Sequence, residues 1–204
     1  EDFAEDTYRT LSAVDSVIMV IDCVKGVEPQ TRKLLEVCRM RNTPVIVFIN
    51  KLDREGQNPF DLLDEIEKEL KIKVRPLTWP IGIGKSFKGV YNLVEKSLNL
   101  FQGDSKTTVE ERLKFNDINA TEIDKLITPD FASQLRADVD LIDGVYDTLD
   151  TQKYLDGKIS PVFFGSAVNN FGIKELLDCF VEVAPSPKER ETDKGIVKPE
   201  DPKF

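Results

Sequence analysis

The stretch PVIVFINKLDREG (residues 44–56) runs from an almost entirely apolar segment straight into a polar loop. Apolar residues in succession over 44–50 are typical of a strand that is buried on both faces of a parallel sheet. The segment SVIMVID (residues 16–22) has the same character, and the residues between the two segments predict a helix over 31–41. A strand, a helix and a strand in this order predict a parallel sheet with right-handed crossover connections.

The alternation of strands and helices continues on both sides of this unit. Asn58 followed by Pro59 is a helix N-cap with proline at the first helical position, so we expect a helix from there to about residue 70. The remaining elements expected in the α/β core are a helix over residues 2–14, a strand over 74–79, a strand and turn over 161–167, and a helix over about 171–183.

The alternation breaks after Pro80. Residues 87–101 have the pattern of short antiparallel strands, and a later amphipathic helix is expected to start at Thr128-Pro129. From Asp104 to Lys158 the chain carries 13 acidic and 7 basic residues. We therefore expect an α/β core over residues 1–84, an inserted α+β subdomain over 85–159, the completion of the core over 160–184, and a proline-containing linker over 185–204.

Composition argues against several classes of function. The formal net charge of −9 makes direct binding to RNA or DNA unfavourable, because proteins that grip phosphates are usually basic. Histidine is absent and the three cysteines are scattered, so we expect reduced thiols and no metal site. No apolar run reaches the roughly 18 residues of a membrane span, and the first residues lack the pattern of a secretion signal. These features predict a cytoplasmic protein without membrane partners.

The polar loop contains Asn50-Lys51-Leu52-Asp53, an Asn-Lys-x-Asp pattern at the carboxyl end of a predicted parallel strand, where ligands of such sheets bind. Guanine presents two adjacent donors, N1–H and the 2-amino group, and the Asp53 carboxylate can accept from both. Adenine has no matching pair of donors and would leave this carboxylate unpaired, which gives discrimination. Lys51 can lay its aliphatic stem across the base, and Asn50 can tie neighbouring loops together. Three fixed positions also arise by chance, but their place after the strand favours guanine recognition.

A second turn, Gly165-Ser166-Ala167, also ends a predicted buried strand. The backbone N–H of Ala167 can donate to the guanine 6-oxo group, and Ser166 can hold Asp53 in place. The tripeptide alone is a weak signal, but together with the first loop it supports one site. The predicted guanine-binding residues are Asn50, Lys51, Asp53, Ser166 and Ala167.

Two other features of the sequence offer competing sites. WPIGIGKS (residues 79–86) approaches the phosphate-loop pattern G-x-x-x-x-G-K-[ST], but Trp79 stands at the first glycine position and the residues after Ser86 resemble a strand. We therefore reject a phosphate loop there. Asp22 and the acidic residues between 65 and 69 invite a metal site, but a loop carboxylate and a solvated helix face are the simpler interpretations.

With these parts in place, the chain resembles the translational GTPases, and among them most closely the peptide chain release factor 3 family. The resemblance lies in EDFAEDTYRTLSAVDSVIMVID (1–22), KGVEPQTRKLLEVCRMRNTPVIVFINKLDREG (25–56), RPLTWPIGIGKSFKGVYNLVEKSLNLFQ (75–102) and ISPVFFGSAVNNFGIKELLDCFVEVAPSP (159–187). Elongation factor G and the ribosomal-protection proteins share the Asn-Lys-x-Asp and Gly-Ser-Ala features. They match DTYRT, VCRMR and TWPIGIGK less well. The acidic insertion matches only in outline.

The resemblance implies a partial P-loop-GTPase-like parallel sheet with helices on both faces, interrupted by an α+β insertion. In this family Glu1-Asp2-Phe3 would follow Asp-Thr-Pro-Gly-His, so that the phosphate loop, the switches, the magnesium site and the catalytic histidine would precede Glu1. We therefore expect this chain to recognise the base of GTP or GDP without hydrolysing the nucleotide, and to hold no catalytic residue. The parent protein would act on the ribosome in termination and promote recycling of class I release factors.

Two alternatives stay open. The chain can be the corresponding part of an elongation factor G or ribosomal-protection GTPase, or it can be an acidic docking module that acts through residues 85–159 on a basic partner. In such folds a further strand would lie beside residues 16–22. Without it, this segment is an exposed apolar edge, and we expect self-association through it.

Overall fold

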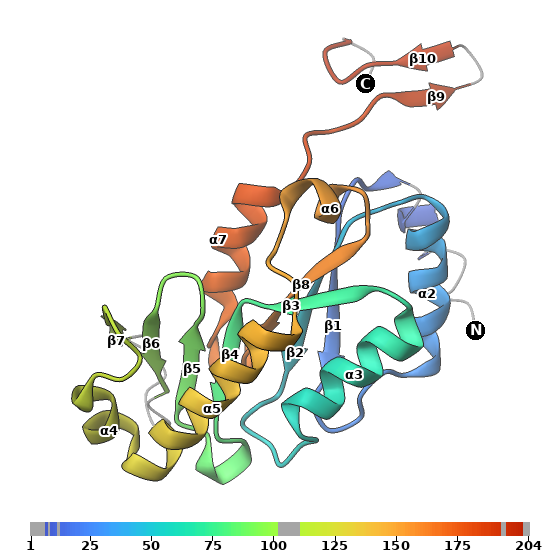
Figure 1. The fold of residues 1–204 in the computed structure, drawn as a ribbon. Helices are drawn as coiled ribbons and strands as arrows, with labels where there is room; N and C mark the ends of the chain where they lie inside the picture. The colour runs from blue at the N-terminus through green and yellow to red at the C-terminus, as the bar shows by residue number, and fades with distance from the viewer. Residues whose placement is uncertain (1–6, 8, 12, 102–110, 193–194, 202–204) are drawn as a thin grey trace.

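The computed structural model describes residues 7, 9–11, 13–101, 111–192 and 195–201. Its centre is a four-stranded parallel sheet with helices on both faces (Figure 1). Across the sheet the strands follow the order β1 (Val17–Asp22), β2 (Val45–Asn50), β8 (Ile159–Phe164) and β3 (Lys73–Pro76). The expected α/β fold with an interrupted parallel sheet is therefore confirmed.

The side chains along β2 point alternately to the two faces of the sheet, and they belong to two apolar clusters, one on each face. Val47 and Ile49 belong to the larger cluster, whereas Ile46 and Phe48 belong to the smaller one. The larger cluster is covered by α2 (Pro29–Met40) and α3 (Pro59–Leu70), and the smaller one by α6 (Thr151–Leu155) and α7 (Ile173–Val183). The α3 helix begins as expected, because the Asn58 side chain accepts a hydrogen bond from the Phe60 amide at 2.9 Å.

A second, antiparallel sheet interrupts the first one between β3 and β8. Its strands, in order, are β4 (Thr78–Ile81), β5 (Gly89–Asn92), β6 (Ser97–Leu100) and β7 (Glu111–Lys114). They are followed by α4 (Thr121–Ile127) and α5 (Pro129–Val145), and α5 starts at the Thr128-Pro129 pair as expected. The larger apolar cluster continues from the parallel sheet into these elements, so one core supports both sheets.

One strand prediction is wrong. Residues 74–79 form two strands in different sheets, because β3 ends at Pro76 and β4 begins at Thr78. Leu77 joins them: its amide donates to the Val162 carbonyl and its carbonyl accepts from the Leu93 amide, both at 2.9 Å. It is buried between the two sheets, so the apolar pattern runs on through the change of sheet. The chain thus enters the second sheet before the domain boundary that we expected after residue 84.

The C-terminal end of the chain differs from the expected picture, whereas the N-terminal end agrees with it at the described residues. The tail is not entirely a linker, since β9 (Arg190–Thr192) and β10 (Gly195–Val197) pair as an antiparallel hairpin (Figure 1). The helix expected over residues 2–14 lies partly outside the described residues, but positions 7, 9–11 and 13 are helical and Leu11 is buried. No helix in the described part of the chain combines the length and the apolar character needed to cross a membrane.

Arg75 fastens the parallel sheet to the insertion. Its side chain is only 10% exposed, and its guanidinium donates to the Asp143 carboxylate at 2.7 Å. It also donates to the carbonyl oxygens of Ile142 and Tyr146, at 3.4 and 3.1 Å. The nearby Lys73–Asp147 pair spans the same junction but is well exposed on both sides. A buried, multiply bonded cation should therefore contribute far more than the exposed pair.

We expect Arg75→Met to lower the free energy of unfolding by about 2 kcal/mol, because it removes three hydrogen bonds from a buried junction. Lys73→Met is the matched control and should change stability little. Urea unfolding monitored by circular dichroism measures both. Equal effects of the two substitutions would contradict the assigned role of Arg75.

The outer strand β1 leaves an apolar edge. Among the described residues β1 pairs only with β2, and Ile18 and Val20 are 36% and 58% exposed. The segment 16–21 carries no charged side chain, although charges are the usual means of protecting such an edge.

We propose that β1 pairs with a second copy of the chain at high concentration. Val20→Lys places a charge on the edge and should shift the protein toward monomer. Val145→Lys, at a similarly exposed valine on α5, should leave the association unchanged. Multi-angle light scattering over a concentration series measures the mass. A wild-type protein that stays monomeric at the highest concentration would contradict the proposal.

Candidate functional site

Two loops meet where β2 and β8 end. The strands are parallel neighbours, with Ile49 opposite Phe164, so their carboxyl ends lie at the same edge of the sheet. The Gly165 amide donates to the Ile49 carbonyl at 3.0 Å, and the Leu52 amide donates back to the Gly165 carbonyl at 3.2 Å. Any side chain at Gly165 would collide with the Phe171 carbonyl, since a Cβ there would lie 2.3 Å from that oxygen. The Asn-Lys-x-Asp loop and the Gly-Ser-Ala turn are therefore held side by side.

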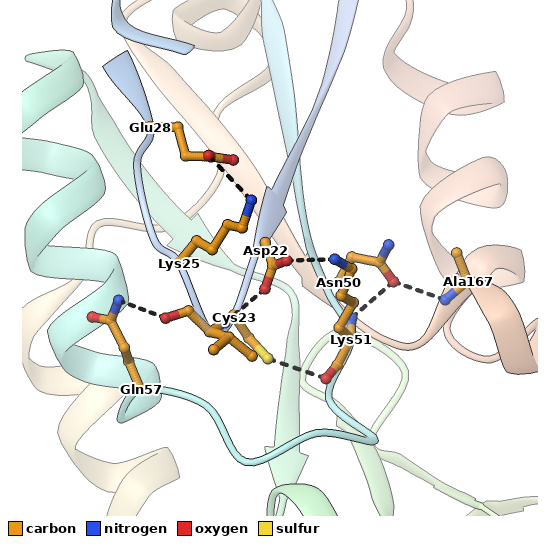
Figure 2. A network of polar contacts seen from close by, with 9 residues as sticks. Asp22, Cys23, Lys25, Glu28, Asn50, Lys51, Gln57 and Ala167 are labelled. Carbon is orange, nitrogen blue, oxygen red and sulfur yellow. Dashed lines mark hydrogen bonds and ion pairs between the residues drawn. The ribbon is translucent and has the colours of Figure 1, made fainter. Parts of the chain in front are cut away.

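Asn50 ties the two loops together, as the sequence suggested. Its Oδ1 accepts hydrogen bonds from the amides of Ala167 and Lys51, each at 2.8 Å (Figure 2). The first of these bonds differs from expectation in one respect. We expected the Ala167 N–H to be directed at a guanine oxygen, but in this structure it points to Asn50, because the asparagine side chain reaches across the gap between the loops.

Ser166 holds Asp53, also as expected. The buried Ser166 hydroxyl donates to Asp53 Oδ1 and accepts from the Asn169 side-chain amide at 2.8 Å. Asp53 itself is only partly buried. Within the described part of the chain, its other carboxylate oxygen has no hydrogen-bond partner. The loop therefore presents a fixed carboxylate with accepting capacity toward solvent.

Lys51 makes an ion pair that the sequence analysis missed. Its Nζ contacts Asp22 Oδ2, while Asp22 Oδ1 accepts from the Val24 amide at 2.8 Å (Figure 2). Burial opposes ionisation of Asp22, but the bonds from Lys51 and Val24 outweigh it and hold the pKa below its ordinary value. The pair therefore persists at neutral pH. Because β1 and β2 are parallel and Asp22 lies opposite Asn50, strand register was the signal for this contact.

Cys23 stabilises the same loop through hydrogen bonds. Its amide donates to the Asn50 carbonyl at 3.0 Å, its thiol donates to the Lys51 carbonyl at 3.1 Å, and its carbonyl accepts from the Gln57 amide at 2.9 Å. Burial, with the nearby charges of Asp22 and Asp53, raises the pKa of this thiol to about 11. Cys23 therefore stays a neutral donor and a structural residue. Figure 2 shows the thiol directed at the Lys51 carbonyl.

The segment that imitates a phosphate loop does not adopt that structure. Gly84–Ser86 forms a single short 3₁₀ turn, and the next element is strand β5 rather than a helix. The amides of Gly84 and Lys85 already donate to groups of the Asn-Lys-x-Asp loop. The rejection of a phosphate loop at residues 79–86 therefore agrees with the structure.

The described residues do not fit a magnesium site. No group of three or more cysteine, aspartate or glutamate side chains among them is placed to share a metal ion, and the chain has no histidine. The acidic residues between 65 and 69 belong to α3, where Glu65 Oε1 accepts from the Val27 amide at 3.1 Å and Glu67 Oε1 from the Val74 amide at 2.9 Å. Asp22 is bound to Lys51.

The chain matches known proteins in sequence and in structure. Residues 1–186 match the family described as the Elongation factor Tu GTP binding domain. A crystal structure of a protein from Thermus thermophilus has a similar fold, with a TM-score of 0.65 over 97% of this chain at 17% sequence identity. The chain spans only 33% of that protein, about a third of its length. The family match covers both loops of the site and ends close to α7. The chain therefore belongs to the family of the elongation factor Tu GTP-binding domain, and so to the translational GTPases.

Proposed function

We propose that this chain recognises the guanine base of GTP and GDP through Asn50, Lys51, Asp53, Ser166 and Ala167. The observation that carries the proposal is the Asp53 carboxylate, which the buried Ser166 in the turn after β8 holds in one orientation. A carboxylate fixed in this way can accept from guanine N1–H and the 2-amino group at once. Adenine offers no such pair of donors. Its binding would remove water from the Asp53 carboxylate without supplying hydrogen bonds in exchange.

The other residues of the site complete this chemistry. Lys51 is 39% exposed at its side chain and keeps its ammonium on Asp22, so its aliphatic stem is available as one wall for a flat base. Asn50 and Ala167 hold the opposite loop at hydrogen-bonding distance. A guanine 6-oxo group would compete with Asn50 for the Ala167 amide.

We further propose that the parent protein is a ribosome-associated GTPase that acts in translation termination in the cytoplasm and promotes recycling of class I release factors. The support is the likeness of DTYRT, VCRMR and TWPIGIGK to the release factor 3 family. An origin in an elongation factor G or ribosomal-protection GTPase is equally compatible with the family match. GTP hydrolysis and magnesium binding would belong to the parent protein, and we expect this chain alone to leave GTP intact.

We expect calorimetric titration to detect GDP binding that is weaker than micromolar, because base contacts supply only part of nucleotide affinity. ADP should give no heat, and Asp53→Ala should weaken GDP binding at least about tenfold, since it removes two hydrogen bonds to a charged acceptor. Asp61→Ala, at an exposed aspartate of α3, is the matched control. Equal binding of GDP and ADP, or no heat with millimolar GDP, would contradict base recognition by this chain. A submicromolar dissociation constant for GDP would contradict the expectation that base contacts supply only part of the nucleotide affinity.

The insertion supports a second candidate function, docking to a basic partner. Its helix α5 exposes Leu141 and Val145, at 48% and 65%, beside the exposed residues Asp140 and Asp143, of which Asp143 also binds Arg75. Apolar anchors among acidic groups suit a basic surface with an apolar centre.

If the parent acts on the ribosome through this surface, the chain should co-sediment with ribosomes in a salt-dependent manner. Replacing Leu141 and Val145 together by lysine should abolish the co-sedimentation, because the change removes the anchors and adds positive charge. Val20→Lys, outside the insertion, is the control. Sedimentation that is unaffected by the double substitution would exclude this surface.

A further inference from the structure

The short turn that imitates a phosphate loop lies against the guanine-recognition loop. It joins β4 to β5, the first two strands of the inserted sheet. The Gly84 amide donates to the Leu52 carbonyl at 2.8 Å, and the Lys85 amide donates to Glu55 Oε1 at 3.2 Å. Leu52 stands between Lys51 and Asp53 and is only 1% exposed. The turn therefore contacts the backbone between Lys51 and Asp53, two of the residues that are proposed to read the base.

The backbone conformation at position 84 favours glycine. Gly84 has φ +61°, in the left-handed region, and a Cβ there would lie 2.3 Å from Glu55 Oε1. Any larger residue would therefore be strained and would push the Glu55 carboxylate away from the Lys85 amide. The lysine side chain is exposed and takes no part, because only its backbone N–H is used. The glycine and lysine that suggest a phosphate loop in the sequence have a different structural role.

The turn is closed by its own hydrogen bonds. The Ser86 hydroxyl donates to the Ile83 carbonyl at 2.8 Å, and the Phe87 amide donates to the Gly84 carbonyl at 3.2 Å. A Cβ at Gly82 would lie 2.3 Å from the Ser86 carbonyl oxygen, so this end of the turn is also closely packed. A rigid turn can hold a neighbouring loop in place, whereas a mobile one would only follow it.

The same turn leads to the second loop of the site. Phe87 follows it directly and packs edge-on against Phe171, with ring centroids 5.5 Å apart. Phe171 in turn exchanges two backbone hydrogen bonds with Ser166, both at 3.0 Å. One end of the inserted sheet thus contacts the Asn-Lys-x-Asp loop directly, through Gly84 and Lys85, and the Gly-Ser-Ala turn indirectly, through Phe87 and Phe171. In Figure 1 the connection between β4 and β5 lies at the same end of the molecule as the loop after β2.

We propose that Gly84 and Glu55 are positioning residues for guanine recognition, and that they couple the inserted sheet to the site. The inference rests on the proposed function, because it assigns these residues to the same pocket. A displacement of β4 and β5 would move the Leu52 carbonyl and alter the orientation of Asp53. By reciprocity, guanine nucleotide would then stabilise the position of the inserted sheet.

Three substitutions separate this role from general stabilisation. Glu55→Ala removes the acceptor of the Lys85 amide, Glu55→Gln keeps an acceptor oxygen, and Gly84→Ala forces the Glu55 side chain away. Lys88→Ala, at an exposed lysine of the same connection, is the matched control. Thermal unfolding would first establish that each variant is folded. Two measurements then follow: amide hydrogen exchange of the wild type and variants, and titration with GDP and with ADP.

We expect Glu55→Ala to speed exchange at the Leu52 and Arg54 amides, and to weaken GDP binding, by about threefold. Gly84→Ala should change both by about tenfold, because alanine adds backbone strain to the lost contact. Glu55→Gln and Lys88→Ala should behave as the wild type, and exchange at Val47 in the core should be the same in all variants. Rescue by glutamine would show that the acceptor oxygen positions the loop.

Two results would overturn the proposal. One is exchange at Leu52 and Arg54 that stays at the wild-type rate in both Glu55→Ala and Gly84→Ala. The other is GDP affinity that stays at the wild-type value in both variants, which would separate the turn from base recognition. If the wild type binds no nucleotide, the proposed function of this chain fails, and the exchange rates alone then decide whether the turn positions the loop.

Discussion

The pairing of β2 with β8 is the contact on which the site depends. Both strands are buried, and their parallel register sets Ile49 opposite Phe164, so that Asn50 and Gly165 leave the sheet together. Every polar contact between the two loops follows from that register. Since side chains alternate along a strand, a shift by one residue would turn Asn50 to the other side of the sheet and separate it from Ala167. The apolar composition of the strands therefore fixes the polar geometry at their ends.

The Asn-Lys-x-Asp loop is strained and is stabilised from several sides. Lys51 has φ +72°, a conformation that costs a non-glycine residue roughly 1 kcal/mol or more. Its backbone is held by the Asn50 side chain and by the Cys23 thiol, and its ammonium is held by Asp22. Each of these partners comes from β1 or β2 or from the residues that directly follow them. The loop is thus prepared for a ligand before one binds, which lowers the ordering cost of binding.

Much of this arrangement follows from the sequence, and the exceptions have physical causes. The buried strands, the Asn58 cap and the two loops could be inferred because each depends on local pattern. The Asp22–Lys51 pair was missed because the sequence shows only a carboxylate in a loop after a strand, which suggests a solvated side chain. The register of β1 against β2 is needed to place Asp22 beside Lys51. The change of sheet at Leu77 was missed because a residue buried between two sheets does not interrupt an apolar run. The contact of Gly84 with Leu52 is invisible in sequence because it joins two backbones.

The insertion between β3 and β8 has a consequence for how the protein folds during its synthesis. The hydrogen bond between Asn50 and Ala167 joins residues 117 positions apart, and β8 must enter the sheet between two strands that are synthesised much earlier. Such non-local pairing is slow to form, because the chain loses the conformational entropy of a long loop before the strand contacts offset that loss. On a translating ribosome, the edges of β2 and β3 that pair with β8 therefore stay unpaired until the whole antiparallel sheet and α5 have been synthesised. An insertion that packs early against the core shared with β2 and β3 would shorten this delay, since it would bring the two ends of the loop together before β8 appears.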